Sequence, residues 1–438
     1  MRAALRGLTT RGRSFLAAGA AAAVAALVLA EKDLLRVSVL LVALPLIAAS
    51  YVARGRRRLE CHRRVLPARI AADGSARVEL ELRNTSRLPS GTLLVDDHLP
   101  YALGAHPRVV LERLGQGQAS TVAYTLRPAV RGHYPIGPLT VRVTDPFGLC
   151  ESAREFPEIV EVTVLPVTTP LAAVRLVGER SGAGDSRGRS VAVHGDDDIA
   201  AREYRHGDDL RRVHWRSTAR SGELMVRREE QPWESRATVL LDTRADAHLG
   251  DGADGSFEWA VSAVASVAVH LRAHGHKVRL VCDGAATETN RHTPTTVDVD
   301  AVDAVTEAAL LDHLADIGVQ RHSDLRTIVD QVRKRQHGGL VVAALGTVDD
   351  VQARALSRLR AHGGTALALV VDATRWSTPD PDARQAWERA HAAGTQALRA
   401  AGWRVVSVGR GDDLAQLWPQ LGRRGRRISP VPAAGALS

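Results

Sequence analysis

The sequence of 438 residues predicts three folded parts: a transmembrane helical hairpin, an antiparallel β-sandwich of immunoglobulin-like type, and an open, doubly wound α/β domain. Two apolar stretches lie close together near the N-terminus. Short alternating runs follow them, and continuous apolar runs separated by amphipathic segments fill the second half. The predicted boundaries are 1–58 for the hairpin with its basic flanks, 59–168 for the sandwich, 169–234 for a connector, 235–420 for the α/β domain and 421–438 for a basic tail expected to be disordered.

The composition is that of a folded, globular protein. Hydrophobic residues make up 45% of the chain and charged residues 24%, so extensive disorder is not expected. The net charge of +9 is compatible with nucleic acid or an anionic membrane surface as a partner. Much of the excess arginine flanks the apolar stretches or lies near the C-terminus, which favours the membrane. Three widely spaced cysteines predict reduced, buried thiols rather than a disulfide framework or a zinc site.

The first apolar stretch runs from Phe15 to Ala30, and the second from Val37 to Ala53 with Pro45 inside it. Each is near the lower limit for crossing a hydrocarbon core about 30 Å thick, which takes about 20 helical residues. A proline is tolerated in such a helix because neighbouring groups can satisfy the freed carbonyl. Only a short charged segment separates the stretches, so we expect a transmembrane hairpin.

The charges around the hairpin predict its orientation. Arginines precede the first stretch and follow the second, whereas the segment between them balances Lys32 and Arg36 against Glu31 and Asp33. The positive-inside rule therefore places both ends, and the soluble domains, in the cytoplasm, with the hairpin in the cell (inner) membrane. The alternative is a cleaved signal peptide, against which stand the second stretch and the arginine-rich segment 54–58.

The segment from 59 to 168 contains short runs rich in β-branched residues, separated by turn signals such as Asp73-Gly74. From Ala76 to Arg83 the apolar residues alternate with charged ones, which is typical of a strand with one buried face. Runs at this spacing predict an antiparallel sandwich, a fold that usually binds or braces. The predicted strands are Leu59–Leu66, Ala76–Arg83, Thr92–Asp96, Arg108–Arg113, Ser120–Arg127, Leu139–Thr144 and Ile159–Leu165.

From Arg236 onward, continuous apolar runs alternate with amphipathic segments. Continuous runs fit parallel strands that are buried on both faces, with helices between them. The ligand crevice of such a domain lies at the carboxyl ends of its strands. The predicted strands are Ala237–Leu241, Val278–Cys282, Leu340–Leu345, Ala366–Val371 and Val405–Val408, and the predicted helices are Ser256–His274, Asp349–His362 and Pro381–Ala401.

Asp242 directly follows the first of these strands, where it either ligates a divalent cation or caps the next turn. The segment resembles the start of von Willebrand factor A domains, whose metal motif is Asp-x-Ser-x-Ser. Here the two serine positions hold Arg244 and Asp246. An arginine beside a Mg²⁺ site is electrostatically unfavourable, and a hydroxyl ligand is missing. We therefore expect no cofactor; if Mg²⁺ does bind, its candidate ligands are Asp242 and Asp246.

The connector contains the densest polar stretch of the chain. Arginines and carboxylates are nearly equal in number between Asp198 and Glu230, so they can pair internally, and a nucleic-acid surface is not expected. Its aromatic residues suit either a domain interface or a partner contact. The candidate residues for these two roles are Arg202, Glu203, Tyr204, Gly207, Asp208, Arg211, Trp215 and Arg220.

The run Arg-Glu-Tyr-x-x-Gly-Asp-x-x-Arg-x-x-x-Trp, which starts at Arg202, resembles the hallmark of the bacterial domain of unknown function 58 family. Segments 131–138 (Arg-Gly-His-Tyr-Pro-Ile-Gly-Pro) and 144–149 (Thr-Asp-Pro-Phe-Gly-Leu) are similar to a second signature of that family. The resemblance implies a von Willebrand factor A-like domain, often encoded beside MoxR-type AAA+ ATPases and transglutaminase-like membrane proteins. It implies no defined biochemical activity.

Topology and resemblance together predict a membrane-anchored, cytoplasm-facing adaptor or scaffold. Its expected partner is a cytosolic protein such as a MoxR-type AAA+ ATPase, or a transglutaminase-like membrane protein, and the hairpin contacts membrane lipid. The alternative is a structural cell-envelope or stress-related protein that has no ATPase partner.

An enzyme is the remaining class, either a metal-dependent hydrolase or one that uses Asp242, His214 or His206. The sequence contains no Gly-x-Ser-x-Gly elbow, Walker loop or His-Glu-x-x-His motif. With 17 histidines in the chain, one near a carboxylate is expected by chance. We therefore predict no catalytic residue.

Overall fold

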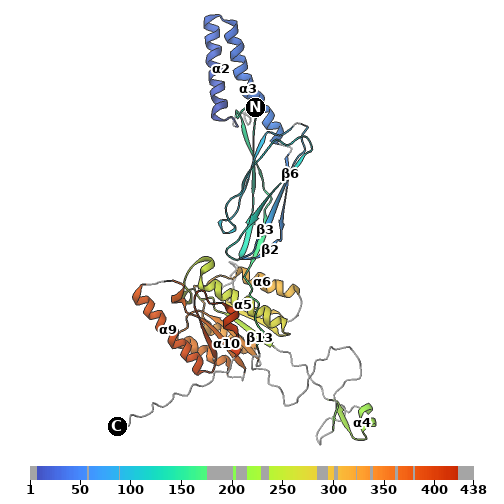
Figure 1. Ribbon diagram of the computed structural model, residues 1–438, viewed down its shortest axis with the longest axis vertical. Helices are drawn as coiled ribbons and strands as arrows, with labels where there is room; N and C mark the ends of the chain where they lie inside the picture. Colours follow the sequence, from blue (N-terminus) through green and yellow to red (C-terminus); the bar gives the residue numbers. More distant parts are fainter. Residues whose placement is uncertain are drawn as a thin grey trace, which may run out of the picture.

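The computed structural model describes residues 7–56, 59–87, 89–174, 201–203, 215–227, 236–283, 294–299, 304–321, 323–335, 339–360, 364–377 and 380–422. An apolar hairpin, a β domain (residues 59–165) and an α/β domain (residues 236–422) follow one another along the length of the molecule (Figure 1). The hairpin lies at one end, and the β domain separates it from the α/β domain.

The hairpin consists of α2 (Thr10–Leu29) and α3 (Lys32–Arg56). Both helices are long and apolar enough to cross a membrane, as predicted. The 20 residues of α2, at about 1.5 Å of rise each, match a hydrocarbon core about 30 Å thick. Ala30 has a φ of 54°, which reverses the chain between the two helices.

Small and hydroxyl side chains hold the two helices together. A Cβ added to Gly19 would lie 2.7 Å from a methyl carbon of Val42, so only glycine allows this approach. The Ser38 hydroxyl donates to the Gly19 carbonyl at 2.7 Å. Small residues and interhelical hydrogen bonds of this kind are typical of helix association in membranes.

The last turns of α3 belong to the β domain. Ala48, Ala49 and Val52 are buried in the same core as the strands. The Tyr51 hydroxyl donates to the carbonyl of Pro89 at 2.7 Å. The last residues of the predicted second span therefore pack against the strands, and the hairpin and the β domain share one core.

The described strands of the β domain form three small sheets around one core, with orders β1-β3-β6, β2-β10-β7 and β5-β4-β8-β9. All their pairings are antiparallel except that of β2 with β10. The strands are β1 (Leu59–Leu66), β2 (Arg69–Ala71), β3 (Ala76–Asn84), β4 (Thr92–Asp97), β5 (Arg108–Leu111), β6 (Ala119–Leu126), β7 (Gly132–Ile136), β8 (Leu139–Thr144), β9 (Glu151–Phe156) and β10 (Val160–Leu165); a short 3-10 helix, η1 (Tyr101–Leu103), lies between β4 and β5.

The alternation seen in the sequence matches burial in the structure. In β3, Val78, Leu80 and Leu82 point into the core, while Arg77 and Glu81 are exposed. All seven predicted strands are present within a few residues of their expected ends. The structure adds β2, β7 and β9, which were not predicted. An immunoglobulin-like topology stays a prediction.

In its described part, the α/β domain has a six-stranded sheet of order β15-β14-β13-β16-β17-β18. Five of these strands are parallel and match the five predicted ones, and β15 is an antiparallel edge strand that was not predicted. The strands are β13 (Arg236–Leu241), β14 (Lys277–Asp283), β15 (Pro294–Val299), β16 (Leu340–Leu345), β17 (Thr365–Val371) and β18 (Arg404–Val408).

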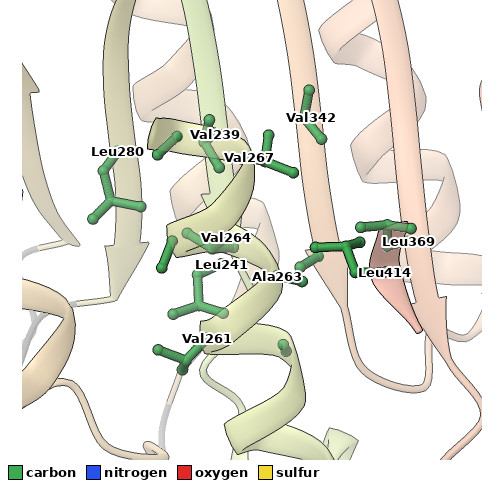
Figure 2. Close-up of a cluster of buried hydrophobic side chains, with 14 of the residues drawn as sticks. Val239, Leu241, Val261, Ala263, Val264, Val267, Leu280, Val342, Leu369 and Leu414 are labelled. Atoms are coloured by element: carbon green, nitrogen blue, oxygen red, sulfur yellow. The ribbon is translucent and has the colours of Figure 1, made fainter. Parts of the chain in front are cut away.

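Helices cover both faces of this sheet, as expected for a doubly wound domain. On one face, Val261, Val264 and Val267 of α5 pack against Val239, Leu241 and Leu280 of the strands (Figure 2). The helices are α5 (Ser256–Ala273), α6 (Ala304–Asp316) and α10 (Leu414–Gly422) on this face, and α7 (Leu325–Arg335), α8 (Asp350–Ser357) and α9 (Pro381–Ala400) on the other, with 3-10 turns η3 (Ala245–Ala247), η4 (Gly252–Asp254), η5 (Arg358–Arg360) and η6 (Ala373–Arg375).

The chain that leaves the β domain packs along the α/β domain. The backbone N–H of Thr169 donates to the Ser266 hydroxyl of α5 at 2.9 Å. Leu171 and Val174 pack against the core, and Val174 lies against Gly422 of α10. The residues just after β10 therefore help to hold the β domain and the α/β domain in position relative to each other.

Candidate functional site

The first candidate site is the carboxyl edge of the parallel sheet, where β13 ends at Asp242. This residue is fully buried, and its N–H donates to the carbonyl of Ala344 at 3.0 Å. The loop after the neighbouring strand, β16, begins at Gly346, whose N–H donates to Asp242 Oδ2 at 3.1 Å. Asp242 therefore links the two central strands at the edge where doubly wound sheets bind ligands.

Arg244 occupies both oxygens of that carboxylate. Its Nε lies 2.9 Å from Asp242 Oδ1 and its Nη2 lies 2.7 Å from Oδ2, a bidentate arrangement. The same Nη2 donates to the carbonyl of Thr347 at 3.0 Å, and Arg244 is only 4% exposed. The arginine that the sequence identified as unfavourable for Mg²⁺ thus provides the positive charge of this site.

The pKa shifts of Asp242 and Arg244 agree with this geometry. Burial alone would raise the pKa of Asp242, but the Arg244 guanidinium outweighs burial and holds that pKa below its usual range. The charge of Asp242 likewise raises the pKa of Arg244 against the effect of its own burial. Both pKa shifts favour the charged forms of the two side chains.

The two predicted metal ligands, Asp242 and Asp246, have different surroundings in the structure. Asp246 is exposed on η3, and the Asp242 carboxylate is filled by Arg244 and by backbone N–H groups. Within the described ranges, no group of three or more His, Cys, Asp or Glu side chains could hold a metal ion. A divalent cation fits here only if the Arg244 guanidinium leaves.

A buried histidine and serine lie beside this pair. His248 Nε2 is 2.9 Å from the backbone carbonyl of Asp242, and its Nδ1 is 3.2 Å from the Ser256 hydroxyl. That hydroxyl also accepts the N–H of Leu249 at 3.0 Å. Burial lowers the pKa of His248, so its neutral form is favoured. Because the histidine contacts the carbonyl rather than the carboxylate, and Ser256 is fully buried, the trio braces the loop and offers no accessible nucleophile.

The second candidate region is the joint between the two domains, where Arg131 reaches from the β domain to α6. Its Nε donates to the carbonyl of Leu314 at 2.8 Å, and its Nη2 donates to that of Ile317. The guanidinium also pairs with Glu258 and lies over the ring of Phe257 at 5.3 Å. Since the last carbonyls of a helix lack partners within it, Arg131 caps α6 from the other domain.

Further contacts between basic and acidic side chains lie near Arg131 in this joint. Arg69 of β2 lies 2.5 Å from Asp312 of α6, and His133 Nε2 lies 3.2 Å from Asp316. The Tyr134 hydroxyl donates back to the carbonyl of Val130 at 3.0 Å, which fixes the turn that carries Arg131. The first half of the second signature therefore makes the joint between the domains.

A cavity of about 320 Å³ lies in this joint, between the β domain and the start of α5. Ala72, Ala129 and Arg131 line it from the β domain. The α/β domain contributes Glu258, Trp259, Trp376, Arg410 and Asp412, among others. Its charged groups already pair with one another, as Arg410 does with Asp254 at 3.2 Å.

The third candidate region is the connector. Arg202 and Glu203 lie in β11 (Ala201–Glu203), which pairs with β12 (Met225–Arg227). Between them, α4 (Trp215–Ser221) carries Trp215, whose side chain is 71% exposed, and Arg220, which is also exposed. The remaining predicted residues, Tyr204, Gly207, Asp208 and Arg211, and the alternative catalytic residues His206 and His214, lie outside the described residues.

The connector unit of β11, α4 and β12 lies apart from the β and α/β domains (Figure 1). Thr218 of α4 fixes it internally, because its hydroxyl accepts the N–H of Met225 at 3.0 Å. The structure thus brings Arg202, Glu203, Trp215 and Arg220 into one small unit, and it does not place Trp215 against either domain.

Sequence reasoning missed the role of Arg131, which it identified only as part of a signature. A single arginine before a β-strand carries no local signal of a contact with a helix 183 residues later. The available signal was that Arg131 opens the Arg-Gly-His-Tyr segment, which was identified from the sequence by its resemblance to a signature.

Residues 200–380 match the model of the family described as protein of unknown function DUF58. The chain has no match among curated proteins.

Among solved structures, the CARDB domain of a Pyrococcus furiosus protein, in complex with di-metal ions, is 17% identical to the chain. This match covers 24% of the chain and 91% of that domain, with a TM-score of 0.18. The putative ApaA protein from Bordetella pertussis is 11% identical over 24% of the chain and 91% of its own length, also with a TM-score of 0.18.

Proposed function

The chain belongs to the DUF58 family, and on that premise we propose that it is a membrane-anchored scaffold that presents a protein-binding surface to a cytosolic partner. The two apolar helices support membrane association. The arginines on both flanks of the hairpin favour an orientation with the soluble domains in the cytoplasm. The adaptor role rests on the connector.

The observation that carries the proposal is the exposure of Trp215. A tryptophan that is 71% exposed leaves a large apolar surface in water. Leu224, next to β12, is also exposed, so the connector unit offers an apolar and basic surface together with Arg220. Tryptophan and arginine are the residues most often found at the energetic centre of protein interfaces.

The β domain supports the same role mechanically. It shares a core with α3 at one end, and at the other end it caps α6 through Arg131. A partner that binds the α/β domain would therefore be held at a set distance from the membrane. We propose a MoxR-type AAA+ ATPase as the partner class because the connector motif resembles the DUF58 hallmark, and that resemblance implies such ATPases as encoded neighbours.

The test uses the full chain in lipid nanodiscs, mixed with a purified MoxR-type ATPase, with and without nucleotide. We expect the ATPase to be retained. Trp215→Ala should weaken binding by a factor of about 30, the size typical of an interface hot spot. Tyr101→Ala is the matched control, because Tyr101 is 97% exposed but lies on the β domain.

Two results would contradict the proposal. If no ATPase is retained in either nucleotide condition, the partner class is wrong. If Trp215→Ala binds as tightly as the wild type, the connector is not the binding surface. Melting curves of both variants should match the wild type, since neither side chain is buried.

A further inference from the structure

The turn between β8 and β9 displays an aromatic side chain at the hairpin end of the β domain. Phe147 is 63% exposed, although the turn that carries it is tightly held. The N–H of Phe147 donates to Asp145 Oδ2 at 2.9 Å, and that of Cys150 donates to Oδ1 at 2.5 Å. Gly148 has a φ of +65°, which closes the turn. The exposure of Phe147 is therefore imposed by its own turn.

The same turn is hydrogen-bonded to the start of α2. The Thr9 N–H donates to the carbonyl of Leu149 at 3.0 Å, and the Thr9 hydroxyl donates to that of Gly148 at 2.7 Å. Gly12 lies so close that an added Cβ would be 2.2 Å from the Leu149 carbonyl oxygen. These contacts fix the height of Phe147 relative to the first membrane helix.

That height corresponds to the headgroup layer of a bilayer. The candidate membrane span begins at Thr10, and its 20 residues, at about 1.5 Å of rise each, match a hydrocarbon core about 30 Å thick. Thr9 therefore lies at the edge of that core, beside a polar layer about 5–8 Å thick. Phe147, at the level of Thr9, thus lies where interfacial aromatic side chains gather.

Exposed arginines lie at the same end of the β domain. Arg11 and Arg13 lie on the first turns of α2. Arg87 lies on the β3–β4 loop, which is held near α3 by the hydrogen bond from the Tyr51 hydroxyl. Arg113 lies on the β5–β6 loop. That loop is next to the β3–β4 loop, because the Leu114 carbonyl accepts the N–H of Ser90. Two carboxylates also lie at this end: Glu112 is exposed, and Glu151 pairs with Arg142 at 3.4 Å.

We propose that this end of the β domain docks on the anionic phospholipid headgroups of the bilayer that holds the hairpin. Phe147 inserts at the boundary between headgroups and acyl chains, and Arg11, Arg13, Arg87 and Arg113 contact the phosphates. The inference rests on the membrane association in the proposed function. Its consequence is that the tilt of the β domain, and with it the height of the α/β domain, is set by lipid contact as well as by the hairpin.

The test places a tryptophan at position 147 in the full chain. All seven native tryptophans follow residue 214, so none lies in the hairpin or the β domain. The Phe147→Trp variant is reconstituted in vesicles of phosphatidylcholine and phosphatidylglycerol that contain lipids brominated high on the acyl chain. Bromine quenches only nearby indole, and we expect clear quenching beyond that of the wild type.

Two reference variants separate the outcomes. Phe15→Trp reports insertion of the hairpin and should be quenched, whereas Tyr101→Trp, at the opposite end of the β domain, should not. Quenching at 15 without quenching at 147 overturns the docking and leaves the membrane anchor intact. If neither position is quenched, the membrane anchor fails, and the docking fails with it.

A separate experiment tests the role of the arginines and of the anionic lipid. Adding Arg87→Ser and Arg113→Ser to Phe147→Trp should reduce the quenching by a factor of about two, as should vesicles of phosphatidylcholine alone. Unchanged quenching in both cases contradicts the part of the proposal that assigns anionic headgroups.

Discussion

The β domain and the α/β domain each bury an aspartate beside an arginine, but the two pairs are built differently. In the β domain, Arg63 donates to one oxygen of Asp97 and the Tyr124 hydroxyl donates to the other, both at 2.6 Å. In the α/β domain, Arg244 alone takes both oxygens of Asp242. The first pair joins strands inside a closed core, and the second lies at the open edge of a parallel sheet.

The protonation of the two aspartates follows this difference. Burial raises the pKa of Asp97 and outweighs the effects of Tyr124 and Arg63. At Asp242 the guanidinium outweighs burial, and the pKa falls below its usual range. The Arg244 guanidinium thus keeps the edge aspartate charged, whereas burial dominates at Asp97.

The substitution expected to change stability most, and so to test this comparison most strongly, is Arg244→Ser. Without the guanidinium, Asp242 stays buried and unpaired, so we expect a loss of about 3–5 kcal/mol in the free energy of unfolding. The serine also creates an Asp-x-Ser-x-Asp segment, so Mg²⁺ should restore part of the loss. Chemical denaturation followed by tryptophan fluorescence measures this, because all seven tryptophans lie beyond the β domain.

Two controls make this prediction specific. Arg244→Met should lose similar stability but show no response to Mg²⁺, because it adds no oxygen ligand. Arg63→Ser in the β domain, followed by circular dichroism because the tryptophans lie beyond that domain, should also be destabilised by several kcal/mol, about the cost of breaking a buried pair, with no metal response. Rescue of Arg63→Ser by Mg²⁺, or its absence for Arg244→Ser, would show that the edge pair is no different from the core pair.

A smaller effect is expected at the joint between the two domains. Arg131→Ala leaves two carbonyls of the α6 end and Glu258 without their partner, so we expect a loss of about 2–3 kcal/mol. Arg69→Ala removes an ion pair whose arginine side chain is 52% exposed and should cost less than about 1 kcal/mol. Equal shifts of the tryptophan-monitored unfolding midpoint in the two variants would mean that Arg131 does not hold the joint.

The smallest expected effect is that of acid pH on the free energy of unfolding of the α/β domain. Burial lowers the pKa of His248, despite the attraction of Asp242, and burial also lowers the pKa values of His270, His313 and His391. The unfolded chain takes up a proton at each histidine near pH 6.5, whereas the folded domain resists it. The free energy of unfolding of the α/β domain should therefore fall as the pH drops below about 6.5.

Protonation of Asp242 also lowers the free energy of unfolding, at a lower pH. Its folded pKa lies below the unfolded value of about 3.9, so the stability it contributes is lost only as the pH falls through that lower range. Unfolding curves between neutral and acid pH measure both effects. Replacing His248 with glutamine should flatten the slope by at most about 1.4 kcal/mol per pH unit, and a slope that stays unchanged would contradict a neutral His248.

Much of the fold could be predicted because its elements have local signals. Alternation identified strands such as β3, and continuous apolar runs identified the parallel strands such as β16. The strand β7 was missed because Gly132-His133-Tyr134-Pro135-Ile136 shows no alternation. The edge strand β15, Pro-Thr-Thr-Val-Asp-Val, was missed because an edge strand needs no continuous apolar run.

The candidate site was less predictable because its contacts are not local. The sequence showed that Arg244 would oppose a cation, but only the structure shows that it binds the Asp242 carboxylate itself. The contact of Arg131 with α6, and that of Thr9 with the β8–β9 turn, join residues far apart in the chain. For the connector, the sequence identified Trp215 but could not decide whether it is covered, and the structure leaves it exposed.

The central claim, a hairpin-anchored protein whose soluble domains face the cytoplasm, is tested most directly by protease accessibility of the full chain. Protease is added to intact spheroplasts and to inverted inner-membrane vesicles, and the α/β domain is detected by an antibody. We predict that the domain is digested in the inverted vesicles and protected in the spheroplasts. Digestion in intact spheroplasts would place the α/β domain and the connector outside the cell and contradict the account.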